Sequence, residues 1–175
     1  MSIQLSLPQS SGRIRQHRDS DLEPMIRHAA NPKVPRFLMD VFPKPYTREH
    51  GEEWLRRCKK ASEVEALAIE VNRQYVGEIT CRRKDDVHRL VGIIGYWLAE
   101  PYWGQGIMTE AVRVFTDHLL SEADLVRVEA CVYEPNKASA RVLEKAGFML
   151  EGIRRKSVIK NGVILDDLIY SKVRD

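Results

Sequence analysis

The segment GYWLAEPYWGQGIMTEAV, residues 95–112, places Gly104 and Gly106 between an apolar run and a stretch with helical spacing. The apolar positions that follow are 107, 108, 111, 112, 115, 119 and 120, which form one face of a helix. A strand that ends near Ala99 therefore leads through a short turn into a helix. The first amides of a helix bind anions, and positions without side chains let a phosphate approach the backbone. This junction predicts an α/β chain with an anion site where a strand meets a helix.

Strand signals elsewhere predict a sheet that is antiparallel near both ends of the chain. Strand-like runs occur at 11–16, 65–71, 74–83, 89–99, 125–132, 149–160 and 163–173. The three runs between 65 and 99 are joined by connections short enough for antiparallel hairpins. Asn161 and Gly162 form a strong two-residue hairpin signal between the last two runs.

Helix signals flank these strands. Ser20 stands three residues before Glu23, which is the spacing of a capping box, and Thr47 can cap a second helix over 48–61. A further helix over 136–148 has Gly147 placed to end it. The segment 31–47 combines several prolines with large apolar residues, and it predicts a packed loop.

Length and composition limit the class of protein. A chain of 175 residues is about one domain, and we expect 1–175 to be that domain, with 1–11 as a loosely ordered extension. Neither an apolar run of about 20 residues nor a signal peptide is present, so we expect a soluble, cytoplasmic protein without membrane contact. The three cysteines are widely spaced, which predicts reduced thiols and no metal site. Because the net charge is only +3, we expect no direct binding of nucleic acid.

Two other phosphate-binding motifs compete for the glycine turn. A dinucleotide fingerprint shares its first glycine spacing, and Glu129 lies on a later strand as that motif requires. Its third glycine, however, is replaced by Thr109, and the upstream hairpins do not build an all-parallel sheet. A nucleoside-triphosphate loop needs a lysine followed by serine or threonine after the glycines, and none stands there.

Two motifs together resemble the GNAT acetyltransferases. PYWGQGIMTEAV is similar to the pyrophosphate-binding turn of that superfamily, and PNKASARVLEKAGF is similar to its second motif. FPKPYT, GYWL and NGVILDDLIYS resemble the branch that includes the RimJ and RimL ribosomal-protein N-terminal acetyltransferases, and the resemblance extends from Gly12 to the end of the chain. It implies an α/β (α+β) fold: a mixed, mostly antiparallel sheet of about seven strands, splayed to admit acetyl-CoA and flanked by about four helices.

The resemblance also implies a set of cofactor-binding residues. The backbone of Trp97, Leu98 and Ala99 would pair with the pantetheine arm of acetyl-CoA. The pyrophosphate would be held by the amides of Gly104, Gln105, Gly106, Ile107, Met108 and Thr109. Asn136 would bind near the acetyl end, and Ser139 would face the departing thiol. Two structural alternatives stay open, since Asn136 can be a helix N-cap and Ser139 an ordinary packing residue.

Three positions depart from the pattern that the resemblance implies. Pro101 replaces the first Gln or Arg of the pyrophosphate motif, which removes a side-chain contact and leaves the amides intact. Leu143 stands where many GNAT enzymes carry the tyrosine that protonates the thiolate, and Ile93 stands where relatives often carry a glutamate. Both usual proton carriers are therefore missing.

The missing proton carriers favour an acceptor amine that is easy to deprotonate. At pH 7 a lysine amine spends about 4.6 kcal/mol to become neutral, and a chain-terminal amine only about 1 to 1.4 kcal/mol. Ser139 is our candidate to protonate the thiolate. Weaker candidates to relay the amine proton are Glu78, Glu129 and Tyr133. We therefore expect acetylation of an N-terminal α-amine, without an acyl-enzyme.

Other functions and roles remain open at this stage. Small amines such as a polyamine, an amino acid or an aminoglycoside are alternative acceptors, and a non-catalytic acyl-CoA-binding module is a third hypothesis. Cys131 precedes Asn136 closely enough for a covalent route, but no neighbouring histidine would activate it. Acceptor specificity should reside in 31–47, the second helix and the last hairpin. Phe37, Phe42 and Trp54 are candidates to line that cleft, and the resemblance makes a homodimer plausible.

Overall fold

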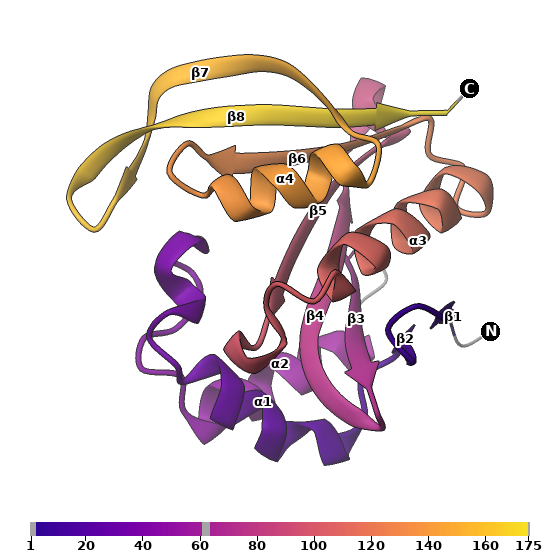
Figure 1. Ribbon diagram of the computed structural model, residues 1–175, viewed down its shortest axis with the longest axis vertical. Helices are drawn as coiled ribbons and strands as arrows, with labels where there is room; N and C mark the ends of the chain where they lie inside the picture. The colour runs from indigo at the N-terminus through magenta and orange to yellow at the C-terminus, as the bar shows by residue number, and fades with distance from the viewer. Residues whose placement is uncertain (1–2, 61–63, 175) are drawn as a thin grey trace.

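The computed structural model describes residues 3–60 and 64–174, and within them the chain forms an eight-stranded sheet with helices on both faces. The sheet order is β1-β2-β3-β4-β5-β6-β8-β7 (Figure 1). The strands are β1 Gln4–Leu7, β2 Gly12–Arg15, β3 Val64–Val71, β4 Gln74–Arg83, β5 Val91–Leu98, β6 Arg127–Tyr133, β7 Met149–Lys160 and β8 Val163–Val173. The α-helices are α1 Leu22–Ala29, α2 Arg48–Lys60, α3 Ile107–Ser121 and α4 Lys137–Lys145.

The first five strands form an antiparallel meander, which confirms the hairpins that the sequence predicts. Two-residue turns close two of the hairpins in the chain. Asn72 and Arg73 have φ of 50° and 64° between β3 and β4, and Asn161 and Gly162 have 51° and 79° between β7 and β8. Positive φ at both central residues is the turn whose twist matches that of paired strands.

The sheet splits between β5 and β6. These two strands are parallel, and they pair only where Val91–Ile93 lies beside Arg127–Glu129. Beyond this point β5 continues to Leu98 and β6 to Tyr133 without a shared register. In Figure 1, β6, β8 and β7 lie across the top while β5 runs down and away from them. The splayed, mostly antiparallel sheet confirms the predicted fold class.

Side chains alternate along the central strands, so they pack into two hydrophobic cores on opposite faces of the sheet. Along β3, Leu67 and Ile69 join a core with α3 and α4, whereas Ala68 faces a second core with α1 and α2. The first core includes Phe115, which is fully buried, and the second includes Tyr75. This alternation is what a strand covered on both faces requires, and it fixes α2 on the face opposite to α3.

The predicted loosely ordered extension at residues 1–11 is wrong over its described part. Residues Gln4–Leu7 form β1, which pairs with β2, and Leu7 is fully buried. After the strand, the amide of Gln9 and the hydroxyl of Ser10 donate to the buried carboxylate of Glu110 at 2.9 and 2.6 Å. The short run lacks a strong strand signal, and long-range pairing with β2 and α3 orders it.

The helix starts follow the predicted signals in part. The capping box expected at Ser20 and Glu23 is replaced by a 3-10 turn over Asp19–Asp21, in which the carboxylate of Asp21 accepts the amide of Arg18 at 2.8 Å. Thr47 precedes α2 as predicted, and its hydroxyl accepts the amide of His50 at 3.5 Å. No helix in the described residues is long and apolar enough to cross a bilayer.

Candidate active site

The turn between β5 and α3 exposes backbone amides at the start of a long helix. A 3-10 turn over Glu100–Tyr102 follows β5, and Gly104 and Gly106 then adopt φ of 74° and 80°. Gly106 is the N-cap of α3 and supplies no capping side chain. The amides at the first helical positions, Ile107 to Thr109, have no acceptor one turn earlier in the helix. Their N–H groups and the helix dipole therefore favour an anion at this place.

Space for that anion lies directly in front of the two glycines. A Cβ atom built at Gly104 or Gly106 would meet no heavy atom of the described residues within 4 Å. The side chain of Gln105 makes a local contact, because its amide donates to the carbonyl of Pro101 at 2.8 Å. Ile107 and Met108 are buried in the core, so only their backbone can contact a ligand. The predicted residues 104–109 thus share one open helix start, and this geometry fits a pyrophosphate.

The free side of β5 starts where its pairing with β6 stops. The amide of Ala99 donates to the carbonyl of Val76 in β4 at 2.8 Å. Backbone N–H and C=O groups alternate in direction along an antiparallel strand. The backbone groups of Trp97 and Ala99 therefore point to β4, whereas those of Tyr96 and Leu98 point into the splay between β5 and β6. The carbonyl of Leu98 accepts the indole N–H of Trp103 at 2.6 Å. Of the three residues predicted to pair with a pantetheine arm, the structure directs Leu98 to the splay and turns Trp97 and Ala99 away.

The start of α4 brings Asn136 and Ser139 together. The side-chain oxygen of Asn136 accepts the amide of Ser139 at 3.3 Å, so Asn136 is the N-cap of α4. A cofactor contact of Asn136 stays a prediction. The hydroxyl of Ser139 lies 2.8 Å from the hydroxyl of Tyr96 on β5, across the splay. Leu143, in the place of the usual tyrosine, is fully buried in the core.

Tyr96 is a candidate functional residue that the sequence interpretation missed. Burial raises the pKa of the Tyr96 phenol, and the hydrogen bond with Ser139 offsets only part of this shift. The phenol therefore keeps its proton at neutral pH, as a proton donor must. Its partner is 43 residues away in sequence, so no local motif indicates the pair. The one sequence feature that could have indicated Tyr96 is its position in Gly95-Tyr96-Trp97, near the end of a strand that leads to the glycine turn.

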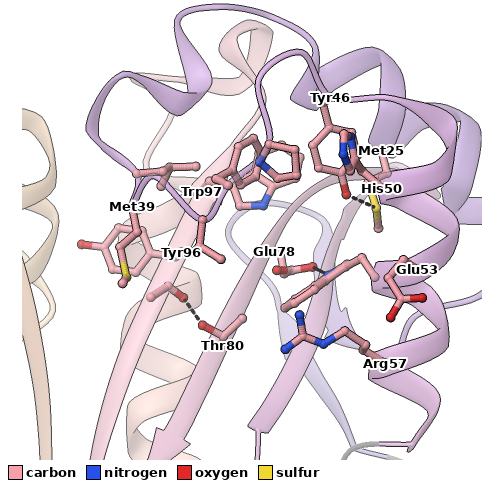
Figure 2. Close-up of a pocket in the computed structure, with 16 residues that line it drawn as sticks. Met25, Met39, Tyr46, His50, Glu53, Arg57, Glu78, Thr80, Tyr96 and Trp97 are labelled. Atoms are coloured by element: carbon pink, nitrogen blue, oxygen red, sulfur yellow. Dashed lines mark hydrogen bonds between the residues drawn. The ribbon is translucent and has the colours of Figure 1, made fainter. Parts of the chain in front are cut away.

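A pocket of about 350 Å³ lies beside Tyr96 between α1, α2, the loop that joins these two helices, and the sheet (Figure 2). Most of its lining is apolar, and carboxylate, imidazole and guanidinium groups stand among the apolar side chains. The lining residues are Met25, Leu38, Met39, Val41, Phe42, Pro43, Tyr46, His50, Glu53, Trp54, Arg57, Glu78, Thr80, Gly95, Tyr96 and Trp97. Segment 31–47 and the second helix both contribute to this lining, and their role in acceptor specificity stays a prediction.

Of Phe37, Phe42 and Trp54, which the sequence predicts to line the acceptor cleft, two contribute to this pocket. Phe42 and Trp54 line the pocket. Phe37 does not belong to the lining found among the described residues, and the guanidinium of Arg36 stacks over its ring at 5.0 Å. The last hairpin contributes through Lys160, whose ammonium is buried and binds the carbonyl of Leu38 and the carboxylate of Asp40. This contact fixes the pocket-lining loop to β7.

Glu78 is the relay candidate that the structure places in the pocket. It is buried, and its Oε2 accepts the indole N–H of Trp54 at 2.5 Å (Figure 2). Glu129 instead pairs with Lys84 and Arg127 on the sheet, both at 2.7 Å. Tyr133 ends β6 and is not part of the lining within residues 3–60 and 64–174.

Cys131 lacks the features of an activated nucleophile. Burial raises the pKa of its thiol, although the nearby guanidinium of Arg154 acts in the opposite direction. Catalytic thiols instead have lowered pKa values. The described residues also contain no group of three or more His, Cys, Asp or Glu side chains that could hold a metal ion.

The structure thus combines a splayed sheet, an open helix start and a largely apolar pocket next to the Tyr96–Ser139 contact. Residues 13–149 match the family described as Acetyltransferase (GNAT) domain. The chain therefore belongs to the GNAT acetyltransferase family, whose cosubstrate is acetyl-CoA. This assignment confirms the predicted enzyme class.

Similar proteins agree with the family. The chain is 56% identical over 78 residues to the probable N-acetyltransferase YjcK of Bacillus subtilis (strain 168), covering 45% of this chain and under half, 43%, of that protein. It is 32% identical over 122 residues to the putative ribosomal N-acetyltransferase YdaF of the same strain. This match covers 70% of this chain and 66% of that protein. A solved structure of a RimL ribosomal alpha-N-protein acetyltransferase in complex with coenzyme A shares the fold, with a TM-score of 0.85 at 20% identity over 99% of this chain and 98% of that one.

Proposed function

We propose that this protein transfers acetyl directly from acetyl-CoA to the N-terminal α-amine of a protein or peptide. The observation that carries this proposal is the contact between Tyr96, which lines the acceptor pocket, and Ser139, which lies across the splay at 2.8 Å. The acceptor pocket and the predicted thioester position therefore adjoin one another. A direct transfer needs this proximity, because both reactants must be held in contact.

The donor half of the site is backbone. The amides of residues 104–109 bind the pyrophosphate, and the edge of β5 at Tyr96 and Leu98 binds the pantetheine arm. Bound acetyl-CoA supplies the acetyl thioester at the splay. As the amine nitrogen bonds to the acetyl carbon, the C–S bond breaks. Ser139, which is hydrogen-bonded to Tyr96, donates a proton to the leaving thiolate, and Tyr96 restores the proton of Ser139. The proton that the nitrogen loses as it becomes an amide returns to Tyr96, which lines the acceptor pocket.

The acceptor half suits an amine attached to an apolar group. A largely apolar lining with the buried carboxylate of Glu78 accommodates one cationic or neutral amine and a hydrophobic first side chain. A polyamine carries several charges along its length, and each needs a partner when it loses water. The pocket instead contains the cation of Arg57 beside the carboxylates of Glu53 and Glu78. The apolar lining therefore favours a peptide N-terminus over a polyamine.

The name of the relative YdaF refers to ribosomal acetylation, and this supports a protein acceptor. We infer a cytoplasmic protein N-terminus, such as that of a ribosomal protein, as the acceptor class. The lower cost of neutralising an α-amine at pH 7, about 3 kcal/mol less than for lysine, points in the same direction.

A thiol-release assay across a matched panel of amines tests the proposal. The panel contains peptides that begin with Met, Leu or Phe, the same peptides with Asp or Lys first, α-N-blocked copies, and a polyamine. We expect release with the apolar first residues, much less with the charged ones and none with blocked copies. Release with the polyamine and not with any peptide would contradict the proposed acceptor class.

A further inference from the structure

A buried imidazole lies behind the acceptor pocket, between two carboxylates. The side chain of His17 is 2% exposed, and its Nε2 lies 3.1 Å from Oε2 of Glu78. Its Nδ1 lies 3.9 Å from Oδ2 of Asp21. Neither ring nitrogen makes an aligned hydrogen bond to the described residues, so both contacts are electrostatic. An unpaired buried polar group costs roughly 1–3 kcal/mol, and such a cost calls for a functional reason.

Asp21 is held as a fixed anion on the far side of this imidazole. Arg15 donates to both of its carboxylate oxygens at 2.8 Å, and the amide of Arg18 donates to Oδ2 at 2.8 Å. Burial alone would raise the pKa of Asp21, but the bonds from Arg15 and Arg18 lower it below the ordinary range. Asp21 is therefore a negative charge at neutral pH, and it stabilises a positive charge on His17.

Glu78 is oriented toward the pocket from the other side. Trp54 and His17 both approach Oε2, which leaves Oε1 without either of these neighbours. In Figure 2 the Glu78 carboxylate lies within the ring of residues that line the pocket. An amine that enters the pocket can therefore meet Oε1 while Oε2 keeps its contact with His17.

The other titratable groups near Glu78 keep their protons. Burial raises the pKa of the Cys58 thiol to about 12, with the charge of Glu78 adding to the shift. Burial also raises the pKa of the phenols of Tyr46 and Tyr75, again with Glu78 as a further cause. These three groups are neutral acids at physiological pH. His50 and Glu53 also line the pocket, but the imidazole that contacts the Glu78 carboxylate among the described residues is that of His17.

We propose that Glu78 and His17 form the proton-accepting pair for the acceptor amine, with Asp21 as the positioning anion. The inference rests on the proposed acetyl transfer to a primary amine. The acceptor amine enters as an ammonium ion. One of its N–H bonds breaks and the proton forms an O–H bond on Glu78, which leaves a neutral nitrogen able to attack the acetyl carbon. The proton then moves to Nε2 of His17, and the imidazolium is stabilised by Asp21. After the amide product leaves, the same proton returns through Glu78 to the open pocket.

The direct test compares Glu78→Gln with Glu129→Gln over a range of pH. Glu129→Gln is the matched control, because that carboxylate is partly buried but ion-paired outside the pocket. At pH 7 we expect Glu78→Gln to lower kcat/KM for the amine by about 10²–10⁴-fold, as for loss of a general base. The loss should shrink toward pH 10, where the amine is already neutral, and coenzyme A affinity should not change.

His17→Gln tests the second member of the pair through the same pH profile. We expect a smaller loss of kcat/KM at neutral pH that is also recovered at high pH, since a purely structural defect would persist at every pH. Equal activity of Glu78→Gln and the wild type, or a loss independent of pH, would overturn the inference. If the wild-type enzyme acetylates no primary amine, the proposed function fails instead, so the two failures are distinguishable.

Discussion

Replacing Gly106 by alanine tests whether the open amides of α3 bind the donor. Gly106 has φ of 80°, a left-handed conformation, and an added Cβ would point into the space in front of the helix start. Gly162 offers a matched control, because its φ is 79° and its added Cβ also meets no described atom within 4 Å. Gly162 lies in the turn between β7 and β8, far in the fold from the start of α3 (Figure 1).

Both substitutions should cost the same strain and only one should cost affinity. Left-handed backbone at a non-glycine residue costs about 1–2 kcal/mol, which corresponds to a fall in Tm of about 2–8 °C for a chain of this size. At Gly106 the methyl group should also displace a phosphate from at least one amide. A hydrogen bond to a charged group contributes about 1.5–3 kcal/mol, so Kd for coenzyme A should rise roughly 10- to 150-fold.

Thermal unfolding and calorimetric titration with coenzyme A measure the two effects separately. We expect Gly106→Ala and Gly162→Ala to lose similar stability, while Gly162→Ala keeps wild-type affinity. If Gly106→Ala binds coenzyme A as tightly as the wild type, or if both variants lose affinity equally, the anion site is not at this turn.

The remaining predictions address the proton donor, the pocket loop, the core and the acid response. Tyr96→Phe should lower kcat in the thiol-release assay by about 10²-fold with unchanged KM for acetyl-CoA; a change in KM alone would contradict its role as a proton donor. Lys160→Met should raise KM for the acceptor and spare coenzyme A affinity, because Lys160 fixes the pocket loop; equal KM values would refute this. Phe115→Ala should lower the free energy of unfolding in urea by about 3–5 kcal/mol, since Phe115 is fully buried, and a loss below 1 kcal/mol would argue against this core. Burial raises the pKa of Asp21, but the bonds from Arg15 outweigh burial, so the pKa of this carboxyl lies below its ordinary value. The stability that the ionised Asp21 contributes is therefore present above the ordinary carboxyl pKa and is lost as pH falls through the lowered pKa. Urea titrations from pH 6 to pH 2 should therefore show a steeper loss for the wild type than for Asp21→Asn, and parallel curves would contradict the assignment.

Local signals in the sequence predict most of the elements of this fold. The Asn161-Gly162 turn, the end of α4 at Gly147 and the glycine turn before α3 each depend on residues close in the chain, and the structure has all three. The strand at Gln4–Leu7 was missed because it is ordered by long-range partners, among them Glu110.

The candidate site was less predictable because its parts are distant in sequence. The turn at 104–109 carries its own motif, whereas Tyr96 acquires its role from Ser139 on another element. His17 lies between β2 and the 3-10 turn at Asp19–Asp21, and no helical or strand pattern in the sequence includes it. Its proposed role depends on its contacts with the buried carboxylates of Glu78 and Asp21, which only the structure reveals. Such contacts depend on strand register and helix packing, which local patterns do not specify.

Peptide mass spectrometry tests the acceptor assignment most directly. The substrate is one peptide with a free N-terminal leucine and an internal lysine, incubated with the enzyme and acetyl-CoA at pH 7. Fragmentation should locate the acetyl group on the α-amine of the leucine, with the lysine side chain unmodified. Acetylation mainly on the lysine, or on both amines at equal rates, would contradict the account.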